Sequence, residues 1–285
     1  MKEHYLDTFR DLPVMPEVAA KVMNLAEGGH DISFTELERI IKADSGLTAR
    51  ILKIANSALY ARQREIKSLQ MAITLLGFKN IKVLVLLVTA SNLFPQLRKS
   101  GFHEAYWKHS ILSAFFSRKL AVRCGRNDIA EEAFIAGLLH DIGQVVLACA
   151  SPEQYAQARD AERLGALLLE TIEEQMFDAN HREVGGALLR KWNFPDLYAD
   201  VALEHETVNI SSPHKTFVIL VSAASILSEK ISPGDISLPK RELLDALLPH
   251  TCLTPAQADD FIAACSAELA QDSLFQEYKL LFDIS

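Results

Sequence analysis

The apolar positions along the chain recur with a helical period. Apolar residues spaced three or four positions apart indicate amphipathic helices, whereas strict alternation with polar residues would indicate strands. The helical spacing repeats along the sequence, and most glycines and prolines fall between the repeats. No sustained alternation and no Asn-Gly or Asp-Gly hairpin turn occurs. The pattern therefore predicts an all-α protein with short connections.

The pattern places the helix boundaries only to within a few residues. The predicted helices are residues 16–27, 34–42, 47–55, 68–75, 80–93, 102–124, 129–150, 152–163, 167–177, 181–191, 196–204, 214–230, 240–247 and 255–281. The last of them is long enough to contain a break. A polar segment with both a proline and a glycine, residues 94–101, is the clearest seam. It divides the chain into a predicted N-terminal helical lobe, residues 1–99, and a larger helical bundle, residues 100–285.

Several predicted helices begin with a recognisable cap. A Ser, Thr or Asp at the N-cap accepts an unpaired backbone N–H, and a glutamate three positions later can reach back to the cap. Proline suits the first helical position, because no N–H is needed there. These patterns occur at Ser33 with Glu36, at Asp128 with Glu131, and where Ser151 and Thr254 each precede a proline.

Charge and hydropathy limit the classes of partner. The formal net charge is −8 and the sequence pI is about 5.6. An acidic chain is poorly suited to coating nucleic acid or an anionic membrane surface. The most apolar run, residues 83–90, is much shorter than the roughly 20 residues that a spanning helix needs. We therefore expect neither a nucleic-acid partner nor a membrane partner.

The cysteines indicate the compartment. The chain has four cysteines, Cys124, Cys149, Cys252 and Cys265. No two of them form a Cys-x-x-Cys pair. The first residues, MKEHYLDTFRDLP, are charged and lack the apolar core of a signal peptide. These observations predict free thiols and a cytoplasmic location.

Residues 137–143 read GLLHDIG and place His140 and Asp141 inside an apolar run. An unpaired buried carboxylate is costly, so this pair needs partners. One interpretation is that the two side chains hold a metal ion. The other is that they bond to each other and to helix ends, and so fix the packing of the central helix.

Four further residues could complete a metal site with this pair. They are His109, His181, His205 and Glu206, spread over several predicted helices. Imidazole and carboxylate ligands suit Fe, Mn, Zn or Ni, and a bridging carboxylate can hold two such ions. Ligands from several helices are a common way to build a metal site in a bundle. Against this, a lone histidine on an apolar helix is usually a hydrogen-bonded core residue.

A local surplus of basic residues lies in the N-terminal lobe, between residues 48 and 82. It could bind an anionic ligand, such as a nucleotide, or an acidic partner protein. The alternative is an ordinary solvated face. The candidate ligand-binding residues are Arg50, Lys53, Arg62 and Arg64.

These segments resemble known families. GLLHDIG resembles the motif of the HD superfamily of metal-dependent phosphohydrolases. Residues 12–26, 37–60, 66–87 and 181–195 together resemble an HDOD domain over about residues 12–206. This resemblance implies an HD-like multi-helix bundle with an additional N-terminal helical lobe. It also implies a bacterial regulator in signal transduction that contacts a signalling protein partner, from a family whose members have mostly lost catalysis.

The resemblance can be compared residue by residue. His109 matches the first histidine of an HD site, and His140 and Asp141 match the HD pair. A later aspartate should lie within residues 220–230, and Ser225 stands about there. In the similar HD-GYP family, which cleaves cyclic dinucleotides, His181 and His205 match two further histidines. Glu206 replaces a third, and no Gly-Tyr-Pro triplet occurs.

Three functions follow. The first is a non-catalytic regulatory module that acts through protein contacts, with no catalytic residues, because a neutral Ser225 hydroxyl is a poor substitute for an anionic ligand. The second is a metal-dependent phosphohydrolase or cyclic-nucleotide phosphodiesterase. The third is a module that binds a nucleotide signal without cleaving it.

Overall fold

The computed structural model describes residues 16–25, 34–56, 66–93, 97, 101–164, 167–231, 236–272 and 275–276. Within these ranges the secondary structure is helical and contains no strand, so the predicted all-α class is confirmed. The chain forms two compact units. The smaller takes in Pro13–Pro95 with Trp192–Phe194, and the larger takes in Gln96–Lys191 and Pro195–Ser285. The seam predicted at 94–101 lies mostly outside the described residues, so the boundary at residue 99 stays a prediction.

The smaller unit is built from five described helices. They are α2 (Glu17–Asn24), α3 (Phe34–Lys42), α4 (Ser45–Ala55), α5 (Leu69–Leu76) and α6 (Phe78–Leu93). Gly77 joins α5 to α6 with a φ of 81°, a left-handed conformation that favours glycine. Asn56, at the end of α4, donates to the carbonyls of Leu52 and Ile66 and accepts from the Ile66 N–H.

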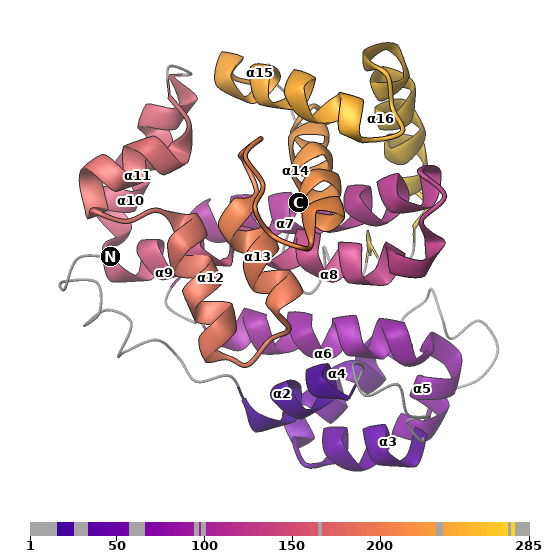
Figure 1. Cartoon of the computed structure of the whole chain (residues 1–285). Helices are drawn as coiled ribbons and strands as arrows, with labels where there is room; N and C mark the ends of the chain where they lie inside the picture. The colour runs from indigo at the N-terminus through magenta and orange to yellow at the C-terminus, as the bar shows by residue number, and fades with distance from the viewer. Residues whose placement is uncertain are drawn as a thin grey trace. The chain divides into compact units, whose positions relative to one another are not determined.

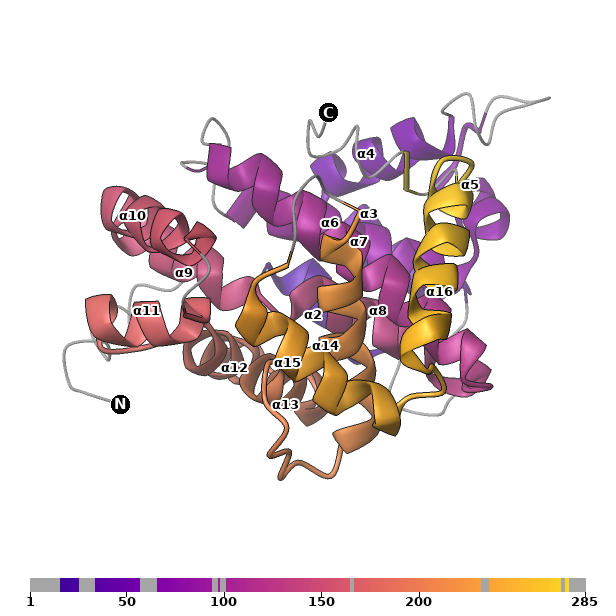
Figure 2. The same cartoon turned by 90° about the horizontal axis from the view of Figure 1, so that it is seen from above.

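The larger unit carries the candidate site. Its described elements are α7 (Gly101–Arg123), η2 (Asn127–Ile129), α8 (Ala130–Leu139), α9 (Ile142–Ala150), α10 (Pro152–Arg163), α11 (Leu169–Phe177), α12 (His181–Lys191), α13 (Asp196–Glu204), α14 (Lys215–Glu229), α15 (Leu238–Leu247), η3 (Leu248–His250) and α16 (Pro255–Leu269). Helix α7 packs against α8 and α14, and α12 packs against α9 and α13 (Figure 1). Helix α15 lies over α14, and α16 stands to one side of it (Figure 2).

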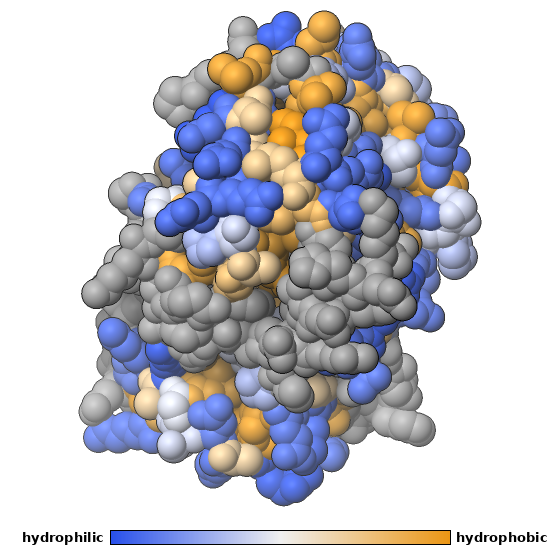
Figure 3. All heavy atoms as spheres, turned by 90° about the vertical axis from the view of Figure 1, so that its left-hand side faces the viewer, coloured by the Kyte–Doolittle hydropathy of each residue, from blue (hydrophilic) through white to orange (hydrophobic). Residues whose placement is uncertain are grey.

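An apolar cluster fills the space between α7, α14, α15 and α16. Phe116 on α7 meets Phe261 on α16 edge to face, with 5.6 Å between ring centres. The face that carries α10 and α11 shows apolar side chains among hydrophilic ones (Figure 3). Leu164, at the end of α10, is 86% exposed, but single exposed apolar residues do not by themselves mark a binding site.

The helix predicted at 129–150 is interrupted, which corrects the sequence analysis. Helix α8 ends at Leu139 and α9 begins at Ile142, so His140 and Asp141 form the turn between them. They were expected on a continuous helix. The segment Asn127–Ala150 is long and apolar enough to cross a membrane by length and composition, but 89% of its most apolar window is buried in the protein. A buried core helix passes the same test.

The predicted N-terminal caps of the helices are confirmed in part. Thr254 forms a full capping box with Gln257. Ser151 is the N-cap of α10 and Pro152 its first residue, as predicted, but the Ser151 side chain makes no cap bond. Asp128 binds Arg126 instead of capping a helix, so that prediction is wrong. Ser33 lies outside the described residues. Helix α16 ends at Leu269, and residues 275–276 are helical again, which is consistent with a break in the helix predicted at 255–281. Residues 277–281 lie outside the described residues.

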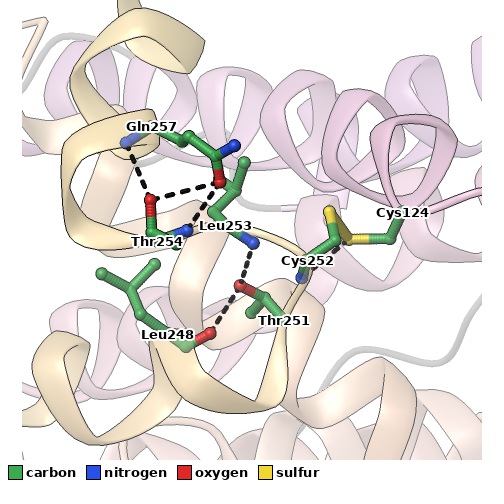
Figure 4. Close-up of a disulfide and its surroundings, with 7 residues drawn as sticks. All are labelled: Cys124, Leu248, Thr251, Cys252, Leu253, Thr254 and Gln257. Carbon is green, nitrogen blue, oxygen red and sulfur yellow. Dashed lines mark hydrogen bonds between the residues drawn. A yellow bond between two sulfur atoms is a disulfide. The ribbon is translucent and has the colours of Figure 1, made fainter.

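Two of the four cysteines are not free, which corrects the prediction of free thiols. Cys124, just after α7, forms a disulfide with Cys252, between η3 and α16 (Figure 4). The Cys252 N–H also donates to Cys124 Sγ at 3.3 Å. Cys149 and Cys265 are free. Only Cys149 and Cys265 therefore remain as the free thiols from which a reducing compartment was predicted.

Candidate metal centre

The glycines of GLLHDIG allow neighbouring helices to approach the turn that carries the HD pair. A Cβ at Gly137 would lie 2.7 Å from Ser117 Oγ and 2.9 Å from Ala114 Cα on α7. A Cβ at Gly143 would lie only 1.9 Å from the His181 carbonyl oxygen on α12. All three distances are shorter than a real Cβ allows. Glycine at both positions therefore brings α7 and α12 against the turn.

The histidines predicted as ligands converge on Asp141. Oδ2 of Asp141 lies 3.4 Å from His109 Nε2 and 3.5 Å from His140 Nε2. Oδ1 lies 3.5 Å from His181 Nε2 and 3.1 Å from His205 Nε2. Each carboxylate oxygen therefore faces one pair of imidazoles. The described residues form two groups that could hold a metal ion, and the groups share Asp141.

Backbone carbonyls determine which ring nitrogens carry protons. His140 Nδ1 lies 2.8 Å from the Gly137 carbonyl, and His205 Nδ1 lies 2.9 Å from the Ala202 carbonyl. Because a carbonyl only accepts, each Nδ1 must be the donor, and in the neutral ring each Nε2 then carries a lone pair. The lone pair of His205 Nε2 faces the Asp141 carboxylate at 3.1 Å. A proton or a metal cation between them relieves this repulsion, so the donor set fits a metal ion.

Glu173, on α11, orients His181. It is fully buried, and its Oε2 accepts from the His181 backbone N–H at 2.8 Å and lies 2.6 Å from His181 Nδ1. Its other oxygen accepts from the Tyr155 hydroxyl at 2.9 Å. A carboxylate behind a ligating histidine fixes the ring and turns Nε2 toward the metal. Sequence analysis missed Glu173, although it stands on the apolar stripe of its helix with Leu169 and Phe177.

Burial and neighbouring charges set the protonation of the centre. Burial, with the nearby histidines, lowers the pKa of His140 to about 3. Burial also acts on His181, but Glu173 and Asp141 outweigh it and raise the pKa to about 9. Burial opposes ionisation of Asp141, yet the surrounding imidazoles hold its pKa well below the ordinary value. Asp141 is therefore an anion at neutral pH, and a metal ion would displace the His181 proton.

Ser225, on α14, lies where the resemblance placed it. Its Oγ is 3.2 Å from both His109 Nε2 and His140 Nε2, and the residue is 8% exposed. A hydroxyl at this position offers a neutral ligand. The group formed by His109, His140 and Asp141 therefore has one anionic side chain among the residues that the structure describes.

Glu206 stands beside the other pair of histidines. Its Oε2 lies 3.9 Å from His181 Nε2 and is buried without a hydrogen-bond partner in the described part of the chain. Its backbone has a φ of 62°, in the left-handed region. A buried carboxylate oxygen without a partner next to an imidazole is what a missing cation would leave, which again fits a metal ion.

The donors do not select one metal. Imidazole and carboxylate ligands suit Zn, Fe, Mn and Ni alike. Of the four basic candidates, Arg50 and Lys53 lie on α4 of the smaller unit. Arg62 and Arg64 lie outside the described residues. Their role in ligand binding stays a prediction.

A protein relative covers most of this chain. It is an uncharacterised protein of Treponema pallidum (strain Nichols), 22% identical over 221 residues, which are 77% of this chain and 42% of that protein. The chain therefore spans less than half the length of that relative.

Solved structures share the fold. An HDOD domain protein with unknown function from Geobacter sulfurreducens has a TM-score of 0.74 at 22% identity, covering 98% of this chain and 96% of the other. A candidate signal transduction protein from Marinobacter aquaeolei VT8 has a TM-score of 0.79 at 21% identity, covering 99% and 62%. A candidate phosphohydrolase from Shewanella amazonensis SB2B has a TM-score of 0.73 at 19% identity, covering 98% of both chains.

At these identities the structures establish the fold alone. The sequence profile of the HDOD domain matches residues 12–208, well over half of the chain. This range includes His109, the HD pair, His181 and His205, whereas Ser225 lies beyond it. The chain therefore belongs to the HDOD domain family.

Proposed function

We propose that this chain is a regulatory module that acts through contacts with a signalling protein and does not hydrolyse phosphoesters. The observation that carries this proposal is the Ser225 hydroxyl, 3.2 Å from both His109 and His140. An HD-type hydrolase would need an anionic ligand there. A neutral hydroxyl takes away much of the attraction for a dication on that side of Asp141.

The other side of Asp141 fits a single, structural metal ion. His181, His205 and Glu206 would hold it together with Oδ1 of Asp141. Both histidines are 1% exposed, and structural sites are closed whereas catalytic sites keep an open position. A bound ion would supply positive charge that links the α8–α9 turn to α12 and to the end of α13.

A second candidate function is a metal-dependent phosphohydrolase. It is favoured by the position of Asp141, because a carboxylate that faces two pairs of imidazoles can bridge two ions. In that case His109 and His140 would hold the second ion with Ser225 as a weak ligand. For either function, a signalling protein as partner and a nucleotide signal as ligand are proposals, and a binding measurement with each of them is the test.

Metal content and turnover separate the two functions. We expect protein purified without chelators to hold one ion per chain, to lose it in His205→Ala and to keep it in His140→Ala. We expect no turnover of cyclic dinucleotides or of bis(p-nitrophenyl) phosphate with added Mn or Fe. Two ions per chain together with enzyme-like turnover would establish the hydrolase instead.

A gain-of-ligand variant sharpens the test. Ser225→Asp places a carboxylate against His109 and His140, so we expect it to bind a second equivalent of metal. Ser225→Asn has nearly the same shape without the charge and serves as the matched control. If both variants bind the same amount of metal as the wild type, the missing charge at residue 225 is not what prevents metal binding between His109, His140 and Asp141.

A further inference from the structure

Within the larger unit, helices α15 and α16 are held to the neighbouring helices by ion pairs and by a disulfide. Helix α15 lies above α14 and has one end directed toward α10 and α11 (Figures 1 and 2). The connection from η3 to α16 returns to the end of α7. The electrostatic fastening of α15 comes from Lys240, and Lys119 and Lys230 pair with Glu268 and Asp259 on α16. The covalent fastening is the disulfide.

Lys240 makes the electrostatic fastening. Its Nζ lies 3.2 Å from Glu162 on α10 and 2.7 Å from Glu229 on α14, and its side chain is 11% exposed. Glu162 also pairs with Arg159 at 2.9 Å. A mostly buried ammonium group needs its partners, so Lys240 ties α15 to α10 and α14.

These ion pairs lie one helical turn outward from the metal centre. On α14, Glu229 follows Ser225 by four residues and therefore shares its face. On α10, Arg159 follows Tyr155 by four residues, and the Tyr155 hydroxyl binds Glu173, which holds His181. Through Lys240, helix α15 thus connects α10 and α14, the two helices that carry Tyr155 and Ser225 beside the centre.

The disulfide makes the covalent fastening. Cys252 is exposed and Cys124 is partly exposed, so a small thiol can reach the bond. The bridge closes a loop across 128 residues of sequence. A cross-link over so long a loop restricts the open forms of the chain strongly.

We propose that α15, η3 and α16 form a strap over the metal centre that reduction of the Cys124–Cys252 disulfide loosens. A dithiol reductant gives up two electrons and two protons, the S–S bond breaks to two thiols, and the reductant closes to its own disulfide. The apolar contacts of Leu244, Leu247 and Phe261 remain, so the reduced strap opens more often without unfolding. The part of this proposal that concerns metal access rests on the proposed function; the strap itself does not.

Hydrogen exchange followed by mass spectrometry tests the strap without any metal. We expect amides of 238–269 to exchange faster by about tenfold or more after a phosphine reduces the disulfide, because the cross-link no longer limits opening. The phosphine reduces the disulfide to two thiols and is itself oxidised to the phosphine oxide, with the oxygen and the two protons supplied by water. Cys252→Ser should behave as the reduced protein does, and Cys149→Ser, which removes a free thiol, should behave as the wild type does. Lys240→Met should speed exchange of α15 in the oxidised protein.

Equal exchange in oxidised and reduced wild type, or four titratable thiols before reduction, would overturn the proposal. The wild-type comparison decides it even if Cys252→Ser does not fold. The location over the centre has its own test, which is the rate at which a chelator removes Mn²⁺ from loaded protein. We expect faster removal after reduction, and an unchanged rate alongside faster exchange would refute that location. Failure to load Mn²⁺ at all would count against the proposed metal site and leave the exchange result to decide the strap.

Discussion

His140 and His181 face the same carboxylate from opposite sides, yet their pKa values shift in opposite directions. The pKa of His140 falls to about 3, whereas the pKa of His181 rises to about 9. Both side chains are 1% exposed. Burial alone therefore cannot explain the difference.

The difference lies behind each ring. His140 Nδ1 meets the Gly137 carbonyl, which is neutral, while His181 Nδ1 meets the Glu173 carboxylate. In front, His140 faces the Ser225 hydroxyl, while His181 faces Glu206 as well as Asp141. The His140 side of Asp141 is therefore poor in negative charge, and the His181 side is rich in it. The comparison teaches that two similar sets of histidines can differ in their capacity for a cation through the groups around them.

The largest expected effect comes from adding a methyl group at the turn. In Gly143→Ala the new Cβ meets the His181 carbonyl, so α12 must move, and we expect a loss of stability of about 3 kcal/mol or more. The displacement should also remove metal from the His181 side. Urea unfolding and metal content measure both effects. Gly137→Ala is the counterpart, since it presses on α7 and should disturb the His109 side while leaving the metal bound. Equal metal loss in both variants would show that the two sides are not separate.

The free energy of unfolding should fall at both ends of the pH range, at alkaline pH because of His181 and at acid pH because of His140. Because the pKa of His181 is raised from 6.5 to about 9, its contribution is complete below about pH 6.5 and is lost as the pH rises through 9. In metal-free protein this amounts to on the order of 3 kcal/mol. The pKa of His140 is lowered, so stability falls as the pH drops below 6.5, where the unfolded chain takes up a proton.

Chemical unfolding of metal-free protein between pH 5 and 10 checks this prediction. His181→Gln should flatten the alkaline limb and His140→Gln should flatten the acid limb below pH 6.5. A common response of both limbs to either variant would contradict the separation of the two sides.

A smaller effect is expected from the group behind His181. Glu173→Gln keeps the shape of the side chain but removes its charge, so we expect metal affinity to fall by about 10- to 100-fold. Glu183→Gln removes an exposed carboxylate from the same region and is the control. Competition with a metal-sensitive dye measures the affinity. An unchanged affinity would mean that Glu173 only fills the core.

Much of the helical pattern could be predicted from the sequence. The helices at Phe34–Lys42, Pro152–Arg163, His181–Lys191 and Asp196–Glu204 begin and end at the predicted residues. Their apolar stripes end at clear polar or proline positions. The break at His140 was missed, because the apolar period continues through it.

The centre was predictable only in part. The histidines and Asp141 could be named because each stands out in an apolar context or matches a motif. That they meet at one carboxylate depends on how α7, α12 and α13 pack, which periodicity does not report. The spacing of Glu173 from Leu169 and Phe177 places it on the apolar stripe of α11, but only the packing against Tyr155 and His181 shows that its carboxylate is buried and bonded. The Cys124–Cys252 bridge joins residues far apart in sequence, and such pairing leaves no local signal.

The central claim is that the side of Asp141 facing Ser225 cannot support hydrolysis. The most direct measurement is turnover of a panel of cyclic dinucleotides by wild-type protein reconstituted with Mn or Fe, with metal stoichiometry determined on the same sample. The account predicts one bound ion per chain and no turnover above that of His205→Ala. Two ions per chain with turnover that His140→Ala abolishes would contradict it.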